Sequence, residues 1–393
     1  MTRTILPTLL CACLVLAACA SPASVRETGP IVIGIYADLS STSAQDGNDA
    51  LRGAQLRVAD ANAGNGVGGR VVQLLQLDSR QSPAEAVKAY STLAQQEGVS
   101  AVIGAAVANG AIAVSPVAEL TKVPYVSLGV DDRAVSPDYS VAAGSPGPGS
   151  VRQFTFMVRP SAARMAGALA SYASSRLPYR RYATLSDPAD PLSLIQARSF
   201  EAVIKKAGQA IAASADIPAD GSDFAAVLDR IAAAGVEAVY LCGGAAQDAA
   251  AARAIRDRGM TVAILGNQAW DAVFLAQAKD AGEGGVFAVG MSPDDPALAG
   301  LSSRMRASFG DAARPLAAWG WDAVGLVLAA VRRAGSSNAL RVRDALEQIT
   351  GFQAVAAQVD MERRSHQLSP LPVAIMTVRS GVFATLDPRY NPP

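Results

Sequence analysis

VSAVIGAAVANGAIAVSPVAELTKVPYVSLG, residues 99–129, is the stretch of this 393-residue chain that decides its fold class. It opens with an almost continuous apolar run, residues 99–105, which is typical of a parallel strand buried on both faces. A helix of small apolar residues follows, and then a second apolar strand at 125–128. The loop 106–110 leaves the carboxyl end of the first strand, where N–H groups of the next helix point toward a ligand. Because this loop has no nucleophile, metal ligand or phosphate-binding lysine, it favours binding without chemistry.

Strands and helices alternate along most of the remaining sequence. The other predicted strands are residues 31–37, 70–77, 182–186, 210–217, 236–241, 262–266 and 285–289. The other predicted helices are residues 46–63, 83–96, 161–176, 192–207, 224–234, 247–258, 298–309, 317–334 and 342–349. Such alternation is typical of right-handed βαβ units and a parallel sheet. A Gly- and Pro-rich segment at 144–150 separates two sets of units, so we expect an α/β fold of two three-layer (αβα) parallel-sheet lobes.

The first 29 residues are expected to direct export. Arg3 precedes an apolar segment, residues 5–16, that is too short to span a membrane and is closely followed by Cys19. Residues 1–18 are therefore predicted to be a signal peptide and residues 19–29 a lipidated tether. The sequence Leu-Ala-Ala-Cys looks like a bacterial lipobox, in which the cysteine is acylated; the alternative is an ordinary signal with an incidental cysteine. Lipidation at Cys19 would anchor the protein on the periplasmic face of a bacterial membrane.

Composition and residue counts argue against several functions. The 34 basic and 34 acidic residues give a formal net charge of zero, which argues against a nucleic-acid partner. The Gly-rich segment 64–69 has the letters of a dinucleotide motif but follows a helix, so it is interpreted as a turn. His366, the only histidine, is expected in an exposed polar loop, and Cys242 at a buried strand end. These two residues alone cannot build a metal site, so no metal, cofactor or enzymatic activity is predicted.

Short segments of the chain occur in an order that resembles a known family. They are IVIGI at 31–35, LRGA at 51–54, GR at 69–70, VIG at 102–104, VS at 126–127, FMVR at 156–159, AVY at 238–240, LG at 265–266 and WDAV at 321–324. Together they are similar to leucine/isoleucine/valine-type periplasmic binding proteins, the substrate-binding components of ABC importers, with the type I periplasmic-binding fold. The resemblance implies three crossovers, near residues 154–157, 290–293 and 369–372. It assigns residues 30–154 and 293–369 to lobe 1, and residues 155–292 and 370–393 to lobe 2.

The resemblance also implies which positions line the ligand site. The expected ligand-binding residues are Asp46, Ala108, Asn109, Gly110, Gly129, Asp131, Gly244, Gln268, Trp270 and Trp319. Ala108, Asn109 and Gly110 stand where amino-acid-binding members carry a serine or threonine for the substrate carboxylate. Gln268 stands in place of the acid that pairs with the ammonium group. Both poles of an α-amino acid would therefore be held more weakly than in those members.

Two acids and the tryptophans leave alternatives open. Asp46 and Asp131 would favour a ligand with a cationic or hydroxyl-rich part if both face the cleft; the alternative is that they cap helices. Trp270, Trp319 and Trp321 are candidates for a stacking wall. Because Trp319 and Trp321 lie two apart on a helix, at least one of them is expected in the core.

These expectations lead to an extracytoplasmic solute-binding lipoprotein. It would capture a small polar solute, such as an amino acid, an amide or a related compound, between two lobes and deliver it to an ABC importer. Its partners would be the solute, the permease and ATPase subunits that meet the closed form, and the membrane that holds the lipid. The alternative is a ligand-sensing or regulatory envelope lipoprotein of the same fold that binds a protein partner.

Overall fold

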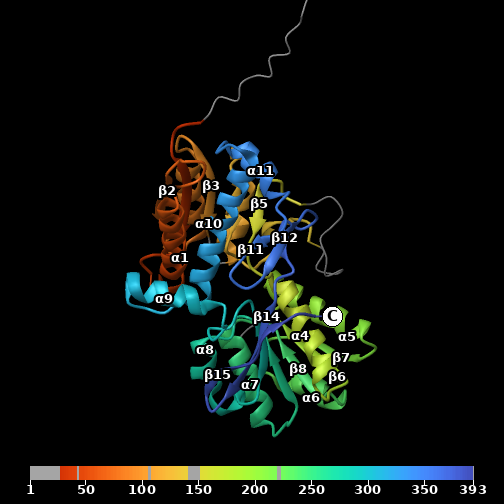
Figure 1. The fold of residues 1–393 in the computed structure, drawn as a ribbon. Helices are drawn as coiled ribbons and strands as arrows, with labels where there is room; N and C mark the ends of the chain where they lie inside the picture. Colours follow the sequence, from red (N-terminus) through yellow and green to blue (C-terminus); the bar gives the residue numbers. More distant parts are fainter. Residues whose placement is uncertain (1–26, 42–43, 105–107, 140–150, 219–222, 393) are drawn as a thin grey trace, which may run out of the picture.

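Two β-sheets form the centres of two lobes (Figure 1). The computed structural model describes residues 27–392 except 42–43, 105–107, 140–150 and 219–222. The eight strands of lobe 1 follow the order β11 (Phe352–Gln353), β12 (Gln358–Glu362), β13 (Gln367–Ser369), β5 (Thr155–Met157), β4 (Tyr125–Ser127), β3 (Val99–Gly104), β1 (Ile31–Ala37) and β2 (Val72–Asp78). The seven strands of lobe 2 follow the order β15 (Val382–Tyr390), β14 (Val373–Arg379), β10 (Val286–Val289), β9 (Ala263–Gly266), β8 (Ala238–Leu241), β6 (Arg181–Ser186) and β7 (Ala210–Asp216).

Most neighbouring strands are parallel. The pairs from β13 to β2 in lobe 1 and from β10 to β7 in lobe 2 all run in the same direction. Antiparallel pairing is confined to β11 and β12 at one edge of lobe 1, and to β14 and β15 at one edge of lobe 2. The predicted α/β fold with two mainly parallel sheets is confirmed.

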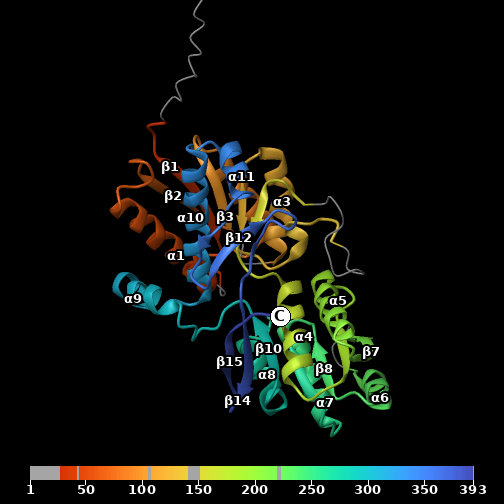
Figure 2. The ribbon, with the colours of Figure 1, turned by 45° about the vertical axis from the view of Figure 1, so that its right-hand side comes forward.

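Helices cover both sheets (Figure 2). Those of lobe 1 are α1 (Ala44–Ala63), α2 (Pro83–Ala94), α3 (Ala108–Thr121), α9 (Leu298–Phe309), α10 (Pro315–Ala334) and α11 (Ala339–Leu346), with the 3-10 helix η1 (Asp132–Ala134). Those of lobe 2 are α4 (Ala162–Arg176), α5 (Pro191–Lys206), α6 (Ala225–Ala233), α7 (Ala245–Asp257) and α8 (Ala272–Ala278), with the 3-10 helix η2 (Lys279–Gly282). None of the helices in the described part of the chain is both long and apolar enough to cross a membrane.

The alternation of side chains along each strand places apolar residues on both faces of the sheets. In β1, Ile33 belongs to the hydrophobic cluster under α1 and α10, whereas Tyr36 belongs to the cluster under α2 and α3. In β8, Val239 and Tyr240 contribute to two separate clusters in the same way. Cys242 is a free, buried thiol at the end of β8, as predicted, and burial raises its pKa. Each lobe therefore has two cores, one on each side of its sheet.

Two glycines let α1 and α10 cross at very short distance. A Cβ atom placed on Gly53 would lie 1.9 Å from the carbonyl oxygen of Ala317. A Cβ atom on Gly320 would lie 2.0 Å from the carbonyl oxygen of Ala50. Each helix thus presents a bare backbone to the other, and a side chain at either glycine would force them apart.

The chain passes between the lobes three times, always at the same edges of the two sheets. It leaves β5 at Met157 and enters α4, leaves β10 at Val289 and enters α9, and leaves β13 at Ser369 and enters β14. β5 and β13 are parallel, and the end of β10 pairs with the beginning of β14 through Val289 and Ala374. All three crossovers therefore meet the carboxyl edges of the parallel strands, so these edges face each other.

The first crossover lies later than expected. The sequence analysis placed it near residues 154–157 and assigned residue 155 onward to lobe 2, but β5 (residues 155–157) pairs with β4 and β13 in the lobe 1 sheet. The crossover is the segment 158–161. The pairing of β5 with β13 is not evident from the sequence, because β13 is polar and β5 is only a short apolar run.

The last residues of the predicted tether are fixed to lobe 1. The Glu27 carboxylate accepts hydrogen bonds from the Ser337 backbone N–H at 2.7 Å and from Arg70 Nη1 at 2.7 Å. Arg70 Nε also donates to the carbonyl oxygen of Gly29 at 2.6 Å. These contacts, together with a bond from Ser336, hold the pKa of Glu27 near 2 although partial burial opposes that shift. Residues 27–29 are thus part of the fold, which corrects the predicted end of the tether; residues 1–26, with Cys19, lie outside the described residues.

Candidate functional site

The start of α3 and the loop after β4 bring part of the predicted ligand site to the carboxyl edge of lobe 1. Gly110 is buried in the first turn of α3, whereas the side chains of Ala108 and Asn109 lie outside the described part of the structure. Gly129 is buried after β4, and its N–H donates to Ser127 Oγ at 3.0 Å. That N–H is therefore already used within the loop.

Asp131 is a capping residue that is paired with an arginine. It is fully buried and is the N-cap of η1, where its Oδ1 accepts from the Arg133 N–H at 2.9 Å. The Arg133 guanidinium donates to both carboxylate oxygens, from Nε to Oδ1 at 3.0 Å and from Nη2 to Oδ2 at 2.6 Å. Of the two open alternatives, the structure shows the cap, and the charge of Asp131 is balanced within lobe 1. Asp46 lies exposed in the first turn of α1.

A second buried acid joins the two lobes at the first crossover. Asp132 accepts from Gln367 Nε2 of lobe 1 at 2.9 Å and from the Ala163 N–H, in the first turn of the lobe 2 helix α4, at 3.3 Å. Burial raises the pKa of Asp132 to about 6, and these hydrogen bonds reduce the shift. No feature of the sequence distinguishes Asp132 from its neighbour Asp131.

In lobe 2, polar side chains tie the loops of the carboxyl edge together. Gly244 is exposed at the N-cap of α7, and its N–H donates to Gln247 Oε1 at 2.9 Å. Gln247 Nε2 in turn donates to Asp187 Oδ2, in the turn after β6, at 2.8 Å. Gln268 is half-buried in the turn after β9. The predicted positions Gly244 and Gln268 thus lie on neighbouring loops of the same edge, as β8 and β9 are adjacent strands.

Asp248 is the centre of a buried network below these loops. Its carboxylate accepts from the Gly243 N–H at 2.8 Å, from Asn267 Nδ2 at 3.2 Å and from Trp270 Nε1 at 2.9 Å. Burial raises the pKa of Asp248 to about 7, against the hydrogen bonds from Trp270 and Gly243. The network fixes the turns that begin α7 and follow β9.

The predicted stacking role of the tryptophans needs correction. Trp270 is only 4% exposed and stacks on Phe274 with ring centroids 3.7 Å apart, inside a core of lobe 2. Trp319, on α10, is 1% exposed inside the core of lobe 1. Both are core residues, because almost none of either side chain is exposed to solvent. Trp321 is half-buried between the guanidinium groups of Arg57 and Arg304, each 4.9 Å from its ring centroid.

Arg159 is a residue at this edge that the sequence analysis did not select. It follows β5 at the start of the first crossover, and its Nη1 donates to the carbonyl oxygen of Leu128 at 2.9 Å. Its Nε atom is enclosed and has no hydrogen-bond acceptor in the described part of the chain. Burial lowers its pKa to about 10, although the charge of Asp46 opposes this shift. The sequence signal for Arg159 is that an arginine directly follows the apolar run TFMV, residues 155–158.

Comparison with known proteins decides the family. A family model described as "Periplasmic binding protein" matches residues 30–382. The chain belongs to this family. Its members are extracytoplasmic binding proteins, and two lobes joined by three crossovers agree with that membership.

Individual relatives of the binding protein are distant. This chain is 25% identical over 238 residues to "Leu/Ile/Val-binding protein homolog 3" of Brucella melitensis. The aligned residues cover 61% of each chain, so the match spans less than two thirds of that relative. A substrate-binding protein of an ABC transporter from Desulfitobacterium hafniense has a similar structure, with a TM-score of 0.76, 19% identity, and coverage of 91% of this chain and 100% of that one. A branched-chain amino acid transporter substrate-binding protein from Streptococcus pneumoniae, solved with isoleucine, gives a TM-score of 0.70, 22% identity, and coverage of 91% and 100%.

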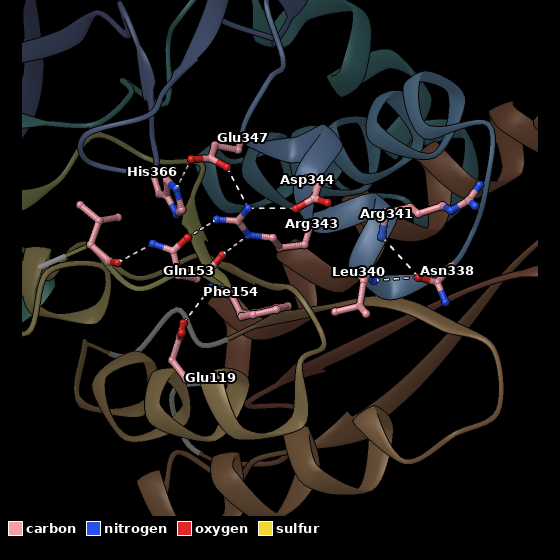
Figure 3. A network of polar contacts seen from close by, with 11 residues as sticks. Glu119, Gln153, Phe154, Asn338, Leu340, Arg341, Arg343, Asp344, Glu347 and His366 are labelled. Atoms are coloured by element: carbon pink, nitrogen blue, oxygen red, sulfur yellow. Dashed lines mark hydrogen bonds and ion pairs between the residues drawn. The ribbon is translucent and has the colours of Figure 1, made fainter. Parts of the chain in front are cut away.

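His366 is buried in this binding protein, so the prediction of an exposed loop is wrong. It is 1% exposed and stacks on Phe156 with ring centroids 4.5 Å apart. Glu347 Oε2 accepts from Arg343 Nη1 at 2.8 Å, its Oε1 lies 3.8 Å from His366 Nε2, and Arg343 Nε donates to the carbonyl oxygen of Gln153 at 2.7 Å (Figure 3). Burial lowers the pKa of His366, which therefore packs as a neutral ring. The network joins α11 to the segment before β5 and to the turn before β13.

A cavity of about 900 Å³ lies beside the first crossover. It is lined from lobe 1 by residues of η1 and of the β12–β13 turn, and from lobe 2 by α4 and α5. None of the predicted ligand-binding residues whose side chains the structure describes lines this cavity. Because both lobes contribute to its walls, its shape depends on their relative position. Among the described residues, no group of three or more His, Cys, Asp or Glu side chains is arranged to hold a metal ion.

Proposed function

We propose that this periplasmic binding protein captures a small polar solute, an amino acid or a related compound, between its lobes and delivers it to an ABC importer. The observation that carries the proposal is the meeting of the two carboxyl edges across three crossovers. The start of α3 and the loop after β4 in lobe 1, and the loops after β8 and β9 in lobe 2, lie at these edges. Ligands of open α/β sheets bind outside the carboxyl ends of the strands.

Lobe closure supplies the signal to the importer. A solute that contacts both lobes stabilises the closed form by its differential affinity for that form, and only this difference shifts the population. The crossovers at 158–161, 290–297 and 370–372 are the segments that would absorb the change. The names of the relatives from Brucella melitensis and Streptococcus pneumoniae support amino acids or similar compounds as the first solutes to test.

The test is to identify a solute directly. Residues 20–393, which omit Cys19, are purified without denaturant and then unfolded, and the released small molecules are identified by mass spectrometry. The compound found is added back to protein that was stripped by unfolding and refolding, and the melting temperature is measured. A stoichiometric solute that raises the melting temperature is expected. No released compound, together with no thermal shift from amino acids, amides, polyamines or aromatic acids, would refute solute capture.

We also propose that Cys19 carries a lipid that anchors the protein to the membrane. The sequence Leu-Ala-Ala-Cys19 after an apolar segment supports this. Metabolic labelling with a fatty acid should mark the full chain and not the Cys19→Ser variant, which should also leave the membrane fraction. Equal labelling of the two chains would contradict the anchor.

A further inference from the structure

We propose that the cavity beside the first crossover is a second ligand site, separate from the solute site, and that it binds a small polyanion such as an organic phosphate or a polycarboxylate. The cavity has a volume of about 900 Å³, which suits a small molecule. Its walls come from both lobes, and they contain none of the predicted solute-binding residues whose side chains the structure describes. The inference therefore goes beyond the proposed function and does not depend on it.

Three arginine side chains line this cavity, two from lobe 1 and one from lobe 2. Arg363 and Arg364 follow each other in the turn between β12 and β13, and Arg164 lies in the first turn of α4. The guanidinium groups of Arg363 and Arg364 have no hydrogen-bond acceptor and no carboxylate partner among the described residues. A guanidinium is always charged, and its planar fork of donors fits the oxygen atoms of a phosphate or a carboxylate.

The turn that carries the two arginines of lobe 1 is held in place at its base. The N–H groups of Ser365 and His366 both donate to the carbonyl oxygen of Glu362, at 3.2 and 2.7 Å. The ring of His366 is buried and stacked on Phe156. The two arginines therefore extend from a fixed backbone, so that only their side chains lose conformational freedom when they bind a ligand.

The arginine of lobe 2 is tied to the third crossover. Arg164 Nη2 donates to the carbonyl oxygen of Leu371 at 2.8 Å, and its Nη1 donates to Ser369 Oγ at 3.3 Å. Burial lowers the pKa of Arg164, and the charge of Glu362 opposes this shift. A ligand with two or more negative groups can contact the arginines of both walls at once, so its affinity depends on the relative position of the lobes.

The two acids among the described lining residues leave an excess of positive charge. The Asp132 carboxylate is already used, because it accepts from Gln367 Nε2 and from the Ala163 N–H. Glu362 is exposed, and its Oε2 accepts from Ser365 Oγ at 2.9 Å. The other polar groups of the wall are hydroxyls and amides, which can donate to the oxygen atoms of an anion. Three arginines facing two acids therefore favour an anionic occupant over a cationic one.

The test measures anion binding to protein that holds no solute. Residues 20–393, stripped of solute by unfolding and refolding, are titrated calorimetrically with pyrophosphate and with citrate at low ionic strength, where charge interactions are least screened. Acetate, which carries a single charge, is the control ligand. The melting temperature of each variant shows whether it is folded.

Two double variants with the same change in charge form a matched pair. Arg363→Ala with Arg364→Ala removes the arginines of the cavity wall in lobe 1. Arg332→Ala with Arg333→Ala removes two consecutive exposed arginines of α10, also in lobe 1, that do not line the cavity. Arg164→Met removes the arginine of lobe 2; if it does not fold, the two double variants decide the question.

Wild-type protein should bind pyrophosphate or citrate with a dissociation constant below about 1 mM, and acetate at least about 10-fold more weakly. The double variant of Arg363 and Arg364 should bind the polyanion at least about 10-fold more weakly, because two charge-assisted contacts are lost, and Arg164→Met should lose about 10-fold. The control pair should stay within about 2-fold of wild type. Glu362→Gln should bind about 2- to 5-fold more tightly, because it removes a negative charge near Arg164 and removes no donor.

Several outcomes would overturn the inference. They are no binding of either pyrophosphate or citrate, an equal loss of affinity in the two double variants, or weaker binding by Glu362→Gln than by wild type. Binding of only one of the two polyanions supports the inference and shows whether the site prefers phosphate or carboxylate groups. Each of these outcomes leaves the proposed function standing, because that function fails only if no solute is released or bound.

Discussion

The crossing of α1 and α10 at Gly53 and Gly320 gives a sharp prediction about stability. Replacing Gly53 by alanine puts a methyl group 1.9 Å from the Ala317 carbonyl oxygen, whereas an ordinary contact requires about 3.4 Å. The two backbones must then separate by about 1.5 Å, because neither carbonyl nor helix axis can rotate away as a side chain can. The separation loosens the core under Trp319.

The magnitude follows from two opposing effects. Overpacking against a rigid neighbour costs about 3 kcal/mol, at the upper end of the usual range, and alanine regains about 1 kcal/mol of helix propensity over glycine. Gly53→Ala should therefore lower the free energy of unfolding by about 2 kcal/mol. Urea unfolding followed by tryptophan fluorescence measures it, since Trp319 and Trp321 both lie in lobe 1.

Gly300→Ala in α9 is the matched control, because nothing lies within 4 Å of a Cβ atom at Gly300. That variant should gain about 0.5–1 kcal/mol from helix propensity alone. The double variant of Gly53 and Gly320 should lose less than the sum of the two single losses, because one separation relieves both contacts. The reasoning is refuted if Gly53→Ala is as stable as wild type or as Gly300→Ala.

Three further predictions concern the carboxyl groups of Asp132, Glu27 and Asp248. The pKa of Asp132 is raised to about 6, so its stabilising contribution is complete below about pH 4 and is lost as pH rises through 6. The free energy of unfolding of Asp132→Asn relative to wild type should therefore rise by about 2 kcal/mol between pH 4 and pH 7.5, as measured by urea unfolding. A difference that stays constant with pH would contradict this prediction. The pKa of Glu27 is lowered to about 2, so Glu27→Gln should destabilise by about 1 kcal/mol at pH 7, with the difference from wild type shrinking as pH falls from 4.5 toward 2. Trp270→Phe removes one donor to the buried Asp248 and should cost about 1–3 kcal/mol of unfolding free energy, measured by urea unfolding; a loss below about 0.5 kcal/mol would argue against a structural role of this bond.

The parallel strands and their helices were predictable because their signals are local. Continuous apolar runs mark strands buried on both faces, and helix starts carry their own caps; Ser82, for example, accepts from the Glu85 N–H before α2. At the antiparallel edge of lobe 2, the sequence predicts an extended segment at residues 373–378, where β14 lies, but β15 was missed. β15 contains Pro388 and is only partly buried, although the two-residue turn at Ser380 and Gly381, both with positive φ, is a hairpin signal.

The site was less predictable because its chemistry depends on contacts between distant segments. His366 belongs to the polar segment MERRSHQ, residues 361–367, yet its side chain is buried. The reason is that β13 pairs with β5, which stacks the His366 ring on Phe156, more than 200 residues away in the chain. Even the local pairing of Asp131 with Arg133 and the stacking of Trp270 on Phe274 depend on side-chain orientation, which the sequence pattern does not specify. The solute-facing role of individual loop residues stays a prediction.

The order of the strands has a consequence for how the chain folds. Residues 162–289 of lobe 2 form a continuous stretch from α4 to β10, whereas lobe 1 combines residues 31–157 with residues 298–369. Contacts that complete lobe 1 join very distant positions; Arg314 bonds to Asp49 across 265 residues, and Ser337 to Glu27 across 310. Because long chain segments must close before such contacts form, lobe 1 should be the slower lobe to fold. During synthesis its N-terminal half waits for residues near the other end, and lobe 2 can be the first to become compact.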